Sequence, residues 1–89
     1  MQKKKQLFIE NKIIKDILDE YLFATNKYSA FNSANEGYAV IKEEVDELWD
    51  IIKKKQSERN YNNLRKEAIQ IAAMAIRFIV DIYIKENKS

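Results

Sequence analysis

The absence of proline and the presence of a single glycine, Gly37, constrain the fold of this 89-residue chain more than any other feature. Proline interrupts helices and glycine weakens them, so a chain almost free of both can form helices with few breaks. Its many Ile, Leu, Lys and Glu residues favour the same structure. The length is that of one small domain. We therefore predict a single all-α domain over residues 1–89.

Hydrophobic periodicity predicts two helices in the first two thirds of the chain, separated by a polar cluster at 29–35. Ser33 and Glu36 form a capping-box pattern at the start of the second helix, in which each side chain bonds a free backbone N–H of the other residue. The first helix, about 4–28, has an apolar face made of Leu7, Ile14, Ile17, Leu18, Tyr21 and Leu22. The second has a seam that we expect to be buried, made of Tyr38, Ile41, Val45, Leu48 and Ile52.

A third helix is predicted to begin near Ser57, a plausible N-cap, and to run beyond residue 80. It is apolar on nearly every side, which is typical of a helix buried nearly all round. Three helices in 89 residues cannot easily surround it, because small chains bury only about 60% of their unfolded surface. We therefore expect an antiparallel hairpin plus an N-terminal helix, assembled into an oligomeric helical bundle, as a homodimer or homotetramer.

The composition excludes several kinds of chemistry. The chain has no histidine and no cysteine, so it has no imidazole base, thiolate nucleophile or disulfide. One glycine cannot build a phosphate-binding glycine-rich loop. The net charge of +2 gives no argument for binding nucleic acid. The apolar stretch 68–84 is short for a membrane span and contains Gln70, Arg77 and Asp81, so we expect a cytoplasmic protein with no membrane association.

Two acids of the second helix lie outside its solvated face. At 100° per residue, that face is made of Lys42, Glu43, Asp46, Asp50, Lys53 and Lys54. Glu44 and Glu47 lie instead on a line between Val40 and Ile51, which predicts that this strip is covered. Two neighbouring carboxylates in a covered strip are unfavourable unless a cation compensates them.

Acids on the third helix are predicted to meet this pair. In an antiparallel hairpin turning near residue 56, facing residues have numbers that add to about 113. Glu44 and Glu47 then lie at the level of Glu67 and Gln70. Oxygen ligands converging between two helices are typical of a hard-cation site for Mg²⁺ or Mn²⁺. The alternative is that Arg65, Lys66 or Arg77 neutralises the acids in place of a metal.

These residues resemble the motifs of the MazG-like, all-α nucleoside triphosphate pyrophosphohydrolases, whose signature is EExxE on one helix and ExxD on the next. Here Glu43-Glu44-Val45-Asp46-Glu47 supplies EExxE, and Glu67-Ala68-Ile69-Gln70 takes the place of ExxD with Gln70 at the Asp position. The resemblance covers about half of the chain, 36–81, and is greatest to short phage-type or mobile-element members.

The resemblance implies a hydrolase that cleaves a (d)NTP between its α and β phosphates, giving a (d)NMP and pyrophosphate. It implies that Glu44, Glu47 and Glu67 are catalytic and that, with Gln70, they hold one or two Mg²⁺ ions, while Glu43 ranks lower because it lies on the solvated face. Arg77 is a candidate for binding the nucleotide's phosphates, with an ion pair to Asp81 as the alternative.

Because Gln70 stands at the Asp position of the second motif, the sequence leaves open whether the protein catalyses the reaction. A glutamine carries no charge and offers one carbonyl oxygen, so weaker catalysis, one metal ion in place of two, or loss of catalysis all fit. The alternative function is therefore a non-catalytic helical module that keeps the fold and binds a protein or a nucleotide. We expect Tyr38, Trp49 and Tyr61 to pack in the core rather than stack on a base.

Overall fold

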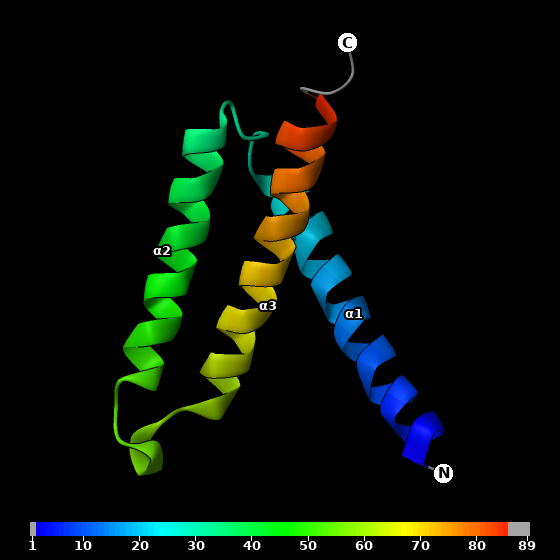
Figure 1. Ribbon diagram of the computed structural model, residues 1–89, viewed down its shortest axis with the longest axis vertical. Helices are drawn as coiled ribbons and strands as arrows, with labels where there is room; N and C mark the ends of the chain where they lie inside the picture. Colours follow the sequence, from blue (N-terminus) through cyan, green and yellow to red (C-terminus); the bar gives the residue numbers. More distant parts are fainter. Residues whose placement is uncertain (1, 86–89) are drawn as a thin grey trace.

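The computed structural model describes residues 2–85, and three helices make up most of this part of the chain (Figure 1). Helix α1 spans Gln2–Lys27, α2 spans Ala34–Ile52 and α3 spans Tyr61–Phe78. A π-helical segment, Ile79–Ile84, continues α3, and a 3₁₀ turn, Gln56–Glu58, lies between α2 and α3. Residues 2–85 contain no strand, which confirms the predicted all-α class. Within them, no helix is both long enough and apolar enough to cross a membrane.

The start of α2 follows the predicted capping pattern in part. Ser33 is the N-cap, and its Oγ accepts a hydrogen bond from the backbone N–H of Glu36 at 3.1 Å. The Glu36 carboxylate reaches one residue further back than a capping box requires, and accepts from the Asn32 N–H at 2.9 Å. Both bonds fix the direction in which the chain enters α2.

The N-cap of helix α3 lies three residues later than the sequence predicted. Ser57 lies inside the 3₁₀ turn, and Asn60 is the N-cap, with its Oδ1 accepting from the N–H of Asn63 at 3.1 Å. Arg59, which follows the 3₁₀ turn, joins it to the end of α2. Its guanidinium donates two hydrogen bonds to the carbonyl of Ile52, at 2.8 and 3.0 Å. These bonds satisfy a carbonyl at the end of α2 that has no partner within the helix.

Helix α3 packs against both of the other helices and runs opposite to α2 (Figure 1). The buried core lies towards its C-terminal half and consists of Ala24, Phe31, Ala73, Met74 and Ile82. Ala73 is completely buried, but Ala75 and Ile79 are exposed on the side of α3 that neither helix covers. The expectation of burial nearly all round is thus met on two sides of α3 and not on the third.

The face of α2 that contacts α3 includes most of the predicted seam and the strip beside it. Ile41, Leu48 and Ile52 of the seam are partly buried, but Tyr38 and Val45 are exposed. Val40 and Ile51, on the strip predicted to be covered, are partly buried as well. At Gly37 the two helices come close, because a Cβ there would lie 2.6 Å from Cδ2 of Phe78. The missing side chain lets α3 approach α2 along the line that also carries Glu44.

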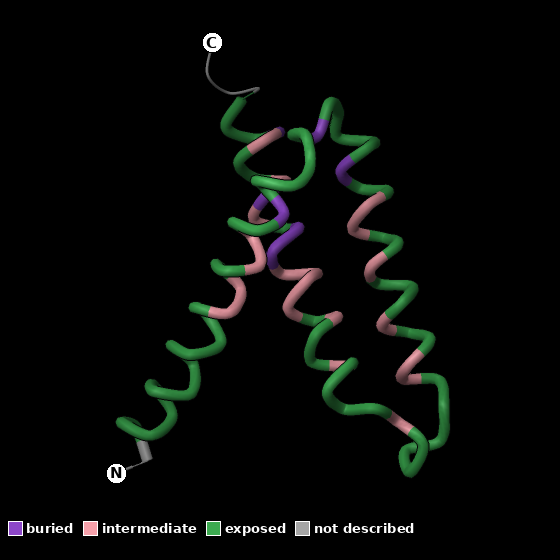
Figure 2. The backbone as a smooth tube through the Cα atoms, turned by 180° about the vertical axis from the view of Figure 1, so that it is seen from behind, coloured by how far each residue is buried: buried purple, intermediate pink, exposed green. Residues whose placement is uncertain are grey.

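Helix α1 diverges from α3 towards its N-terminus, so residues 3–15 are all exposed (Figures 1 and 2). Of the predicted apolar face of this helix, only Ile17 and Tyr21 are partly buried and pack on the core. The other members of that face are exposed, namely Leu7, Ile14, Leu18 and Leu22.

Candidate metal centre

Three carboxylates from two helices converge at the middle of the α2–α3 contact. Glu44 and Glu47 come from α2 and Glu67 from α3, and one oxygen of each lies within 4.8 Å of the others. Glu44 and Glu67 are partly buried, and Glu47 is exposed. These three residues, called the acid triad below, are the ones that the sequence predicted to meet.

Gln70 lies beside the acid triad, one turn along α3 from Glu67. Its amide satisfies its neighbours when the nitrogen faces the acids, and Nε2 then donates to Glu44 Oε2 at 2.9 Å and to Glu67 Oε2 at 3.2 Å. In the opposite orientation the amide oxygen would face these carboxylate oxygens. A cation between them, or a proton on one of the carboxyls, would make that arrangement favourable.

No basic side chain among residues 3–85 forms an ion pair with the acid triad. Arg65 is occupied elsewhere, since its Nη2 lies 2.7 Å from Oδ2 of Asp16 on α1. Lys66 and Arg77 form no ion pair with these acids either. In the described part of the chain, therefore, no Arg or Lys neutralises the acid triad through an ion pair, as the alternative prediction required.

The crowding of like charges changes how the acids titrate. Burial, the hydrogen bond to Glu67 and the negative charge of Glu47 raise the pKa of Glu44 to about 7. Desolvation and the charge of Glu67 raise the pKa of Glu47 above its usual value. A site that holds protons this strongly in the absence of a cation is one whose negative charge is not compensated by the protein.

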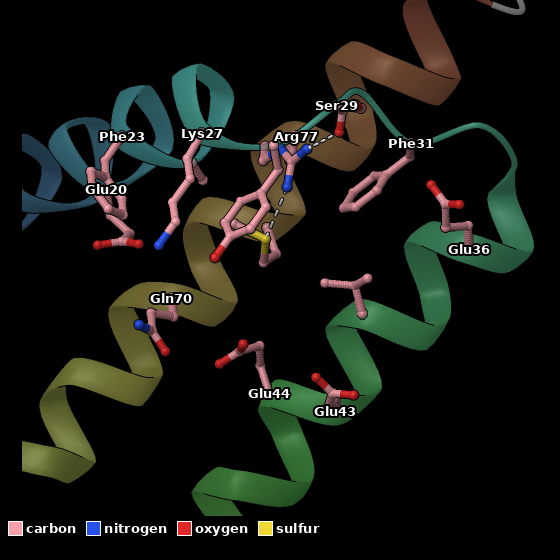
Figure 3. Close-up of a pocket in the computed structure, with 14 residues that line it drawn as sticks. Glu20, Phe23, Lys27, Ser29, Phe31, Glu36, Glu43, Glu44, Gln70 and Arg77 are labelled. Carbon is pink, nitrogen blue, oxygen red and sulfur yellow. Dashed lines mark hydrogen bonds between the residues drawn. The ribbon is translucent and has the colours of Figure 1, made fainter.

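A cavity of about 550 Å³ borders the acid triad (Figure 3). Glu44 points into it from α2 and Gln70 from α3. Its far end is formed by three aromatic rings, two cations and two further acids: Phe23, Tyr28, Phe31, Lys27, Arg77, Glu20 and Glu36. The three rings were not among the residues predicted for the site. Phe31 is an apolar residue inside a polar loop, and this position could have indicated that it packs against another part of the chain.

Arg77 is buried in the wall of this cavity, with 4% of its surface exposed. Its guanidinium donates to the carbonyl of Ser29 at 2.7 Å, contacts the sulfur of Met74 and lies 4.4 Å from the ring centre of Phe31 (Figure 3). The Asp81 carboxylate accepts instead from the N–H of Phe31 at 3.0 Å. Within residues 3–85 no ion pair joins Arg77 to Asp81, so both hold the α1–α2 loop on α3.

Three aromatic residues expected in the core lie outside it. Tyr38, Trp49 and Tyr61 are all exposed and line neither the core nor the cavity. Tyr38 and Trp49 lie on α2 where its side chains are exposed, 63% and 58% of their surface respectively. Glu43 is exposed as expected, and its side chain borders the cavity beside Glu44.

The donor set is suited to a hard cation. Three carboxylates and one amide oxygen, with neither nitrogen nor sulfur ligands, match the preference of Mg²⁺ and Mn²⁺. Comparison of the chain with protein-family models, with curated protein sequences and with solved structures finds no match. The geometry of the site and the chemistry of its residues therefore carry the functional argument.

Proposed function

We propose that this protein is a nucleotide pyrophosphohydrolase that depends on Mg²⁺ or Mn²⁺ and cleaves a (d)NTP to a (d)NMP and pyrophosphate. One observation carries the proposal: three carboxylates from two helices converge beside a cavity, and no basic side chain in the described part of the chain pairs with them. Such an arrangement is unfavourable in the protein alone and favourable around a cation.

The site residues take their roles from this placement. Glu44, Glu47 and Glu67 would hold the metal, and Gln70 would add its amide oxygen after a half-turn of the amide. The bound metal would supply charge stabilisation at the phosphates and lower the pKa of an attacking water. Because Glu47 is the exposed member of the acid triad, it lies where a ligand can approach the site from solvent.

The cavity supports a nucleotide as the substrate. Small-molecule sites usually enclose about 300–1,000 Å³, and this cavity has about 550 Å³. With phosphates at the acid triad, the remainder of the nucleotide would lie towards the rings of Phe23, Tyr28 and Phe31. Lys27 and Arg77 lie at that end together with the acids Glu20 and Glu36. Arg77, the phosphate-binding candidate from the sequence, would therefore meet the nucleotide at the end away from the acid triad.

Gln70 supports the second candidate function, a non-catalytic helical module that binds a protein or a nucleotide. It replaces an acid by a neutral amide, which already bonds Glu44 and Glu67 in the metal-free site. Loss of one charge weakens the attraction for a divalent ion, since each carboxylate ligand contributes to that attraction.

Location, family and assembly belong to the same proposal. We propose a cytoplasmic MazG-like protein, on the motifs of residues 43–47 and 67–70. We also propose a homodimer or homotetramer, because many large apolar side chains are exposed on α1, on α2 and after α3. Unpartnered apolar surface of this extent is typical of chains that associate.

The decisive experiment is a screen of NTPs and dNTPs with Mg²⁺ or Mn²⁺ for released pyrophosphate. We expect turnover with at least one nucleotide, and a loss of about 100-fold or more in Glu44→Gln and Glu67→Gln, because a ligand carboxylate is replaced by an amide. Asp46→Asn on the solvated face of α2 is the matched control and should retain turnover. Release of no pyrophosphate, together with nucleotide binding by the same protein, would favour the non-catalytic module.

A further inference from the structure

Helix α1 has a second apolar face that α3 does not cover. Ala24, Ile17 and Tyr21 face α3, whereas another set of side chains lies about a quarter turn away around the helix. That set, called the outer α1 stripe, consists of Leu7, Ile14, Leu18 and Leu22, which are 56%, 53%, 46% and 55% exposed. Its members fall within an arc of about 80° and recur every seven or four residues, as in the seam of a coiled coil.

The chain exposes more surface than a compact protein of its size. The structure exposes 7076 Å², whereas a compact protein of 10.6 kDa exposes about 5,500 Å². The radius of gyration is 15.3 Å, against about 12 Å for a compact domain of this length. The excess area is about 1,600 Å², and a stable interface needs about 800 Å² from each partner. One further copy packed on α1 would therefore cover about half of the excess.

The charges along α1 favour a second copy in the opposite direction. Residues 2–15 carry five lysines and one acid, whereas residues 16–27 carry three acids and one lysine. An antiparallel pair places each basic half beside an acidic half, and a parallel pair would place like charges together. Lys12 and Asp19 lie on the same flank of the outer α1 stripe, so an antiparallel pair brings Lys12 of one copy near Asp19 of the other, which pairs with Lys15 of its own helix at 2.9 Å.

We propose that two copies of this chain associate through the outer α1 stripe, antiparallel, about a twofold axis near Ile14. Leu7 of each copy then lies opposite Leu22 of the other, and the contact is the same patch on both chains. The associating surface and the antiparallel direction of the two α1 helices do not depend on whether the acid triad catalyses a reaction.

Sedimentation of the full chain at micromolar concentration tests the surface. We expect a dimer whose dissociation constant rises about 100-fold or more in Leu18→Lys, because two buried leucines are lost per dimer. The matched control is Trp49→Lys, at a side chain of α2 that is 58% exposed, which should leave the dimer intact. A monomeric wild type, or a dimer lost in Trp49→Lys and retained in Leu18→Lys, would overturn the proposal.

Disulfide crosslinking tests the direction, since the chain has no cysteine of its own. Ile14→Cys at the centre should form a dimer with itself on oxidation. Leu7→Cys should not, but a mixture of Leu7→Cys and Leu22→Cys chains should crosslink. Efficient self-crosslinking of Leu7→Cys would show a parallel pair and overturn the antiparallel one. Helix content measured by circular dichroism verifies that each variant folds.

Discussion

Helix α2 carries acids on two faces, and the structure treats them differently. Asp46 and Asp50 face solvent, where Lys42 and Lys53 lie 3.1 and 3.0 Å from them. Glu44 and Glu47 face α3, where the nearest charged neighbour is another acid, Glu67. One helix thus holds balanced acids on its wet face and unbalanced acids on its packed face.

None of the ion pairs in the described part of the chain involves the acids on the packed face of α2. Basic residues are as frequent as acidic ones in this chain, and several of them lie within one or two positions of the acid triad, for example Lys42 and Lys66. Ion pairs on an exposed helix face are worth only about 0.3–0.5 kcal/mol and arise readily. Unpaired acids in a partly buried place are costly, and this cost is the basis of the proposed metal site.

The largest difference between the two faces of α2 should appear in the effect of metal ions on Tm. At a Mg²⁺ concentration about 100 times the dissociation constant, binding stabilises the fold by about 2.7 kcal/mol, or more than 10 °C in Tm for a domain of this size. We expect this rise in the wild type and in Asp46→Asn, and none in Glu44→Gln. Thermal melts with Mg²⁺, Mn²⁺ and EDTA measure it.

Equal metal responses in Glu44→Gln and Asp46→Asn would contradict the metal site. A response to Mn²⁺ that survives in Glu44→Gln but is lost in Glu67→Gln would move the site towards α3.

The second prediction concerns the contact between Gly37 of α2 and Phe78 of α3, where the two helices approach closely. Gly37→Ala puts a Cβ against the Phe78 ring and close to Phe31. Overpacking of this kind costs about 1–3 kcal/mol, so Tm should fall by about 5–15 °C. Asn35→Ala, at an exposed position of the same turn, is the control and should change Tm by far less.

A second substitution makes this test sharper. Phe78→Leu in the Gly37→Ala background removes the ring that the new Cβ meets, so part of the lost stability should return. If Gly37→Ala alone is as stable as the wild type, α2 and α3 are not as close as the structure has them.

Periodicity predicted the three helices and the acids that meet, because both depend on spacing along single helices. The pairing of Glu44 and Glu47 with Glu67 needed one further step, the turn of the chain between α2 and α3. The close approach of α2 and α3 could not be predicted in the same way. It depends on Gly37 and Phe78, which are far apart in the sequence and meet only after the helices pack.

The cavity was beyond prediction for a related reason. Its rings come from the end of α1 and the α1–α2 loop, and the loop is held in place by long-range bonds from Ser29 to Arg77 and from Phe31 to Asp81. In the sequence, Arg77 and Asp81 look like an i, i+4 ion pair on one helix face. In the folded chain both side chains bond the α1–α2 loop instead, because the partly buried backbone groups of this loop need hydrogen-bond partners.

The third prediction uses pH to separate the two faces. An unfolded Glu44 titrates near 4.5 and the folded one has a pKa of about 7, so the metal-free fold keeps its proton longer than the unfolded chain does. Stability from this group is present below pH 4.5 and is lost as pH rises through 7. After solvent screening, the loss is about 1 kcal/mol, or several degrees in Tm.

Two variants isolate this effect from other titrations. Glu44→Gln should flatten the change in Tm between pH 5 and pH 8, and Asp46→Asn should leave it. Mg²⁺ should reverse the trend, because a metal binds the deprotonated carboxylates that form at higher pH. An unchanged pH profile in Glu44→Gln would mean that this acid is not confined as the structure shows.

The smallest effect should come from the wet face itself. Lys42→Ala removes the 3.1 Å ion pair to Asp46, in which both side chains are more than half exposed. Exposed i, i+4 pairs contribute about 0.3–0.5 kcal/mol and are screened by salt, so Tm should fall by no more than about 3 °C at low salt and by less in 1 M NaCl. The response to Mg²⁺ should be unchanged, since Lys42 has no contact with the acid triad. If Lys42→Ala instead strengthened metal binding several-fold, the lysine would be competing for those acids, and the two faces of α2 would be one electrostatic unit.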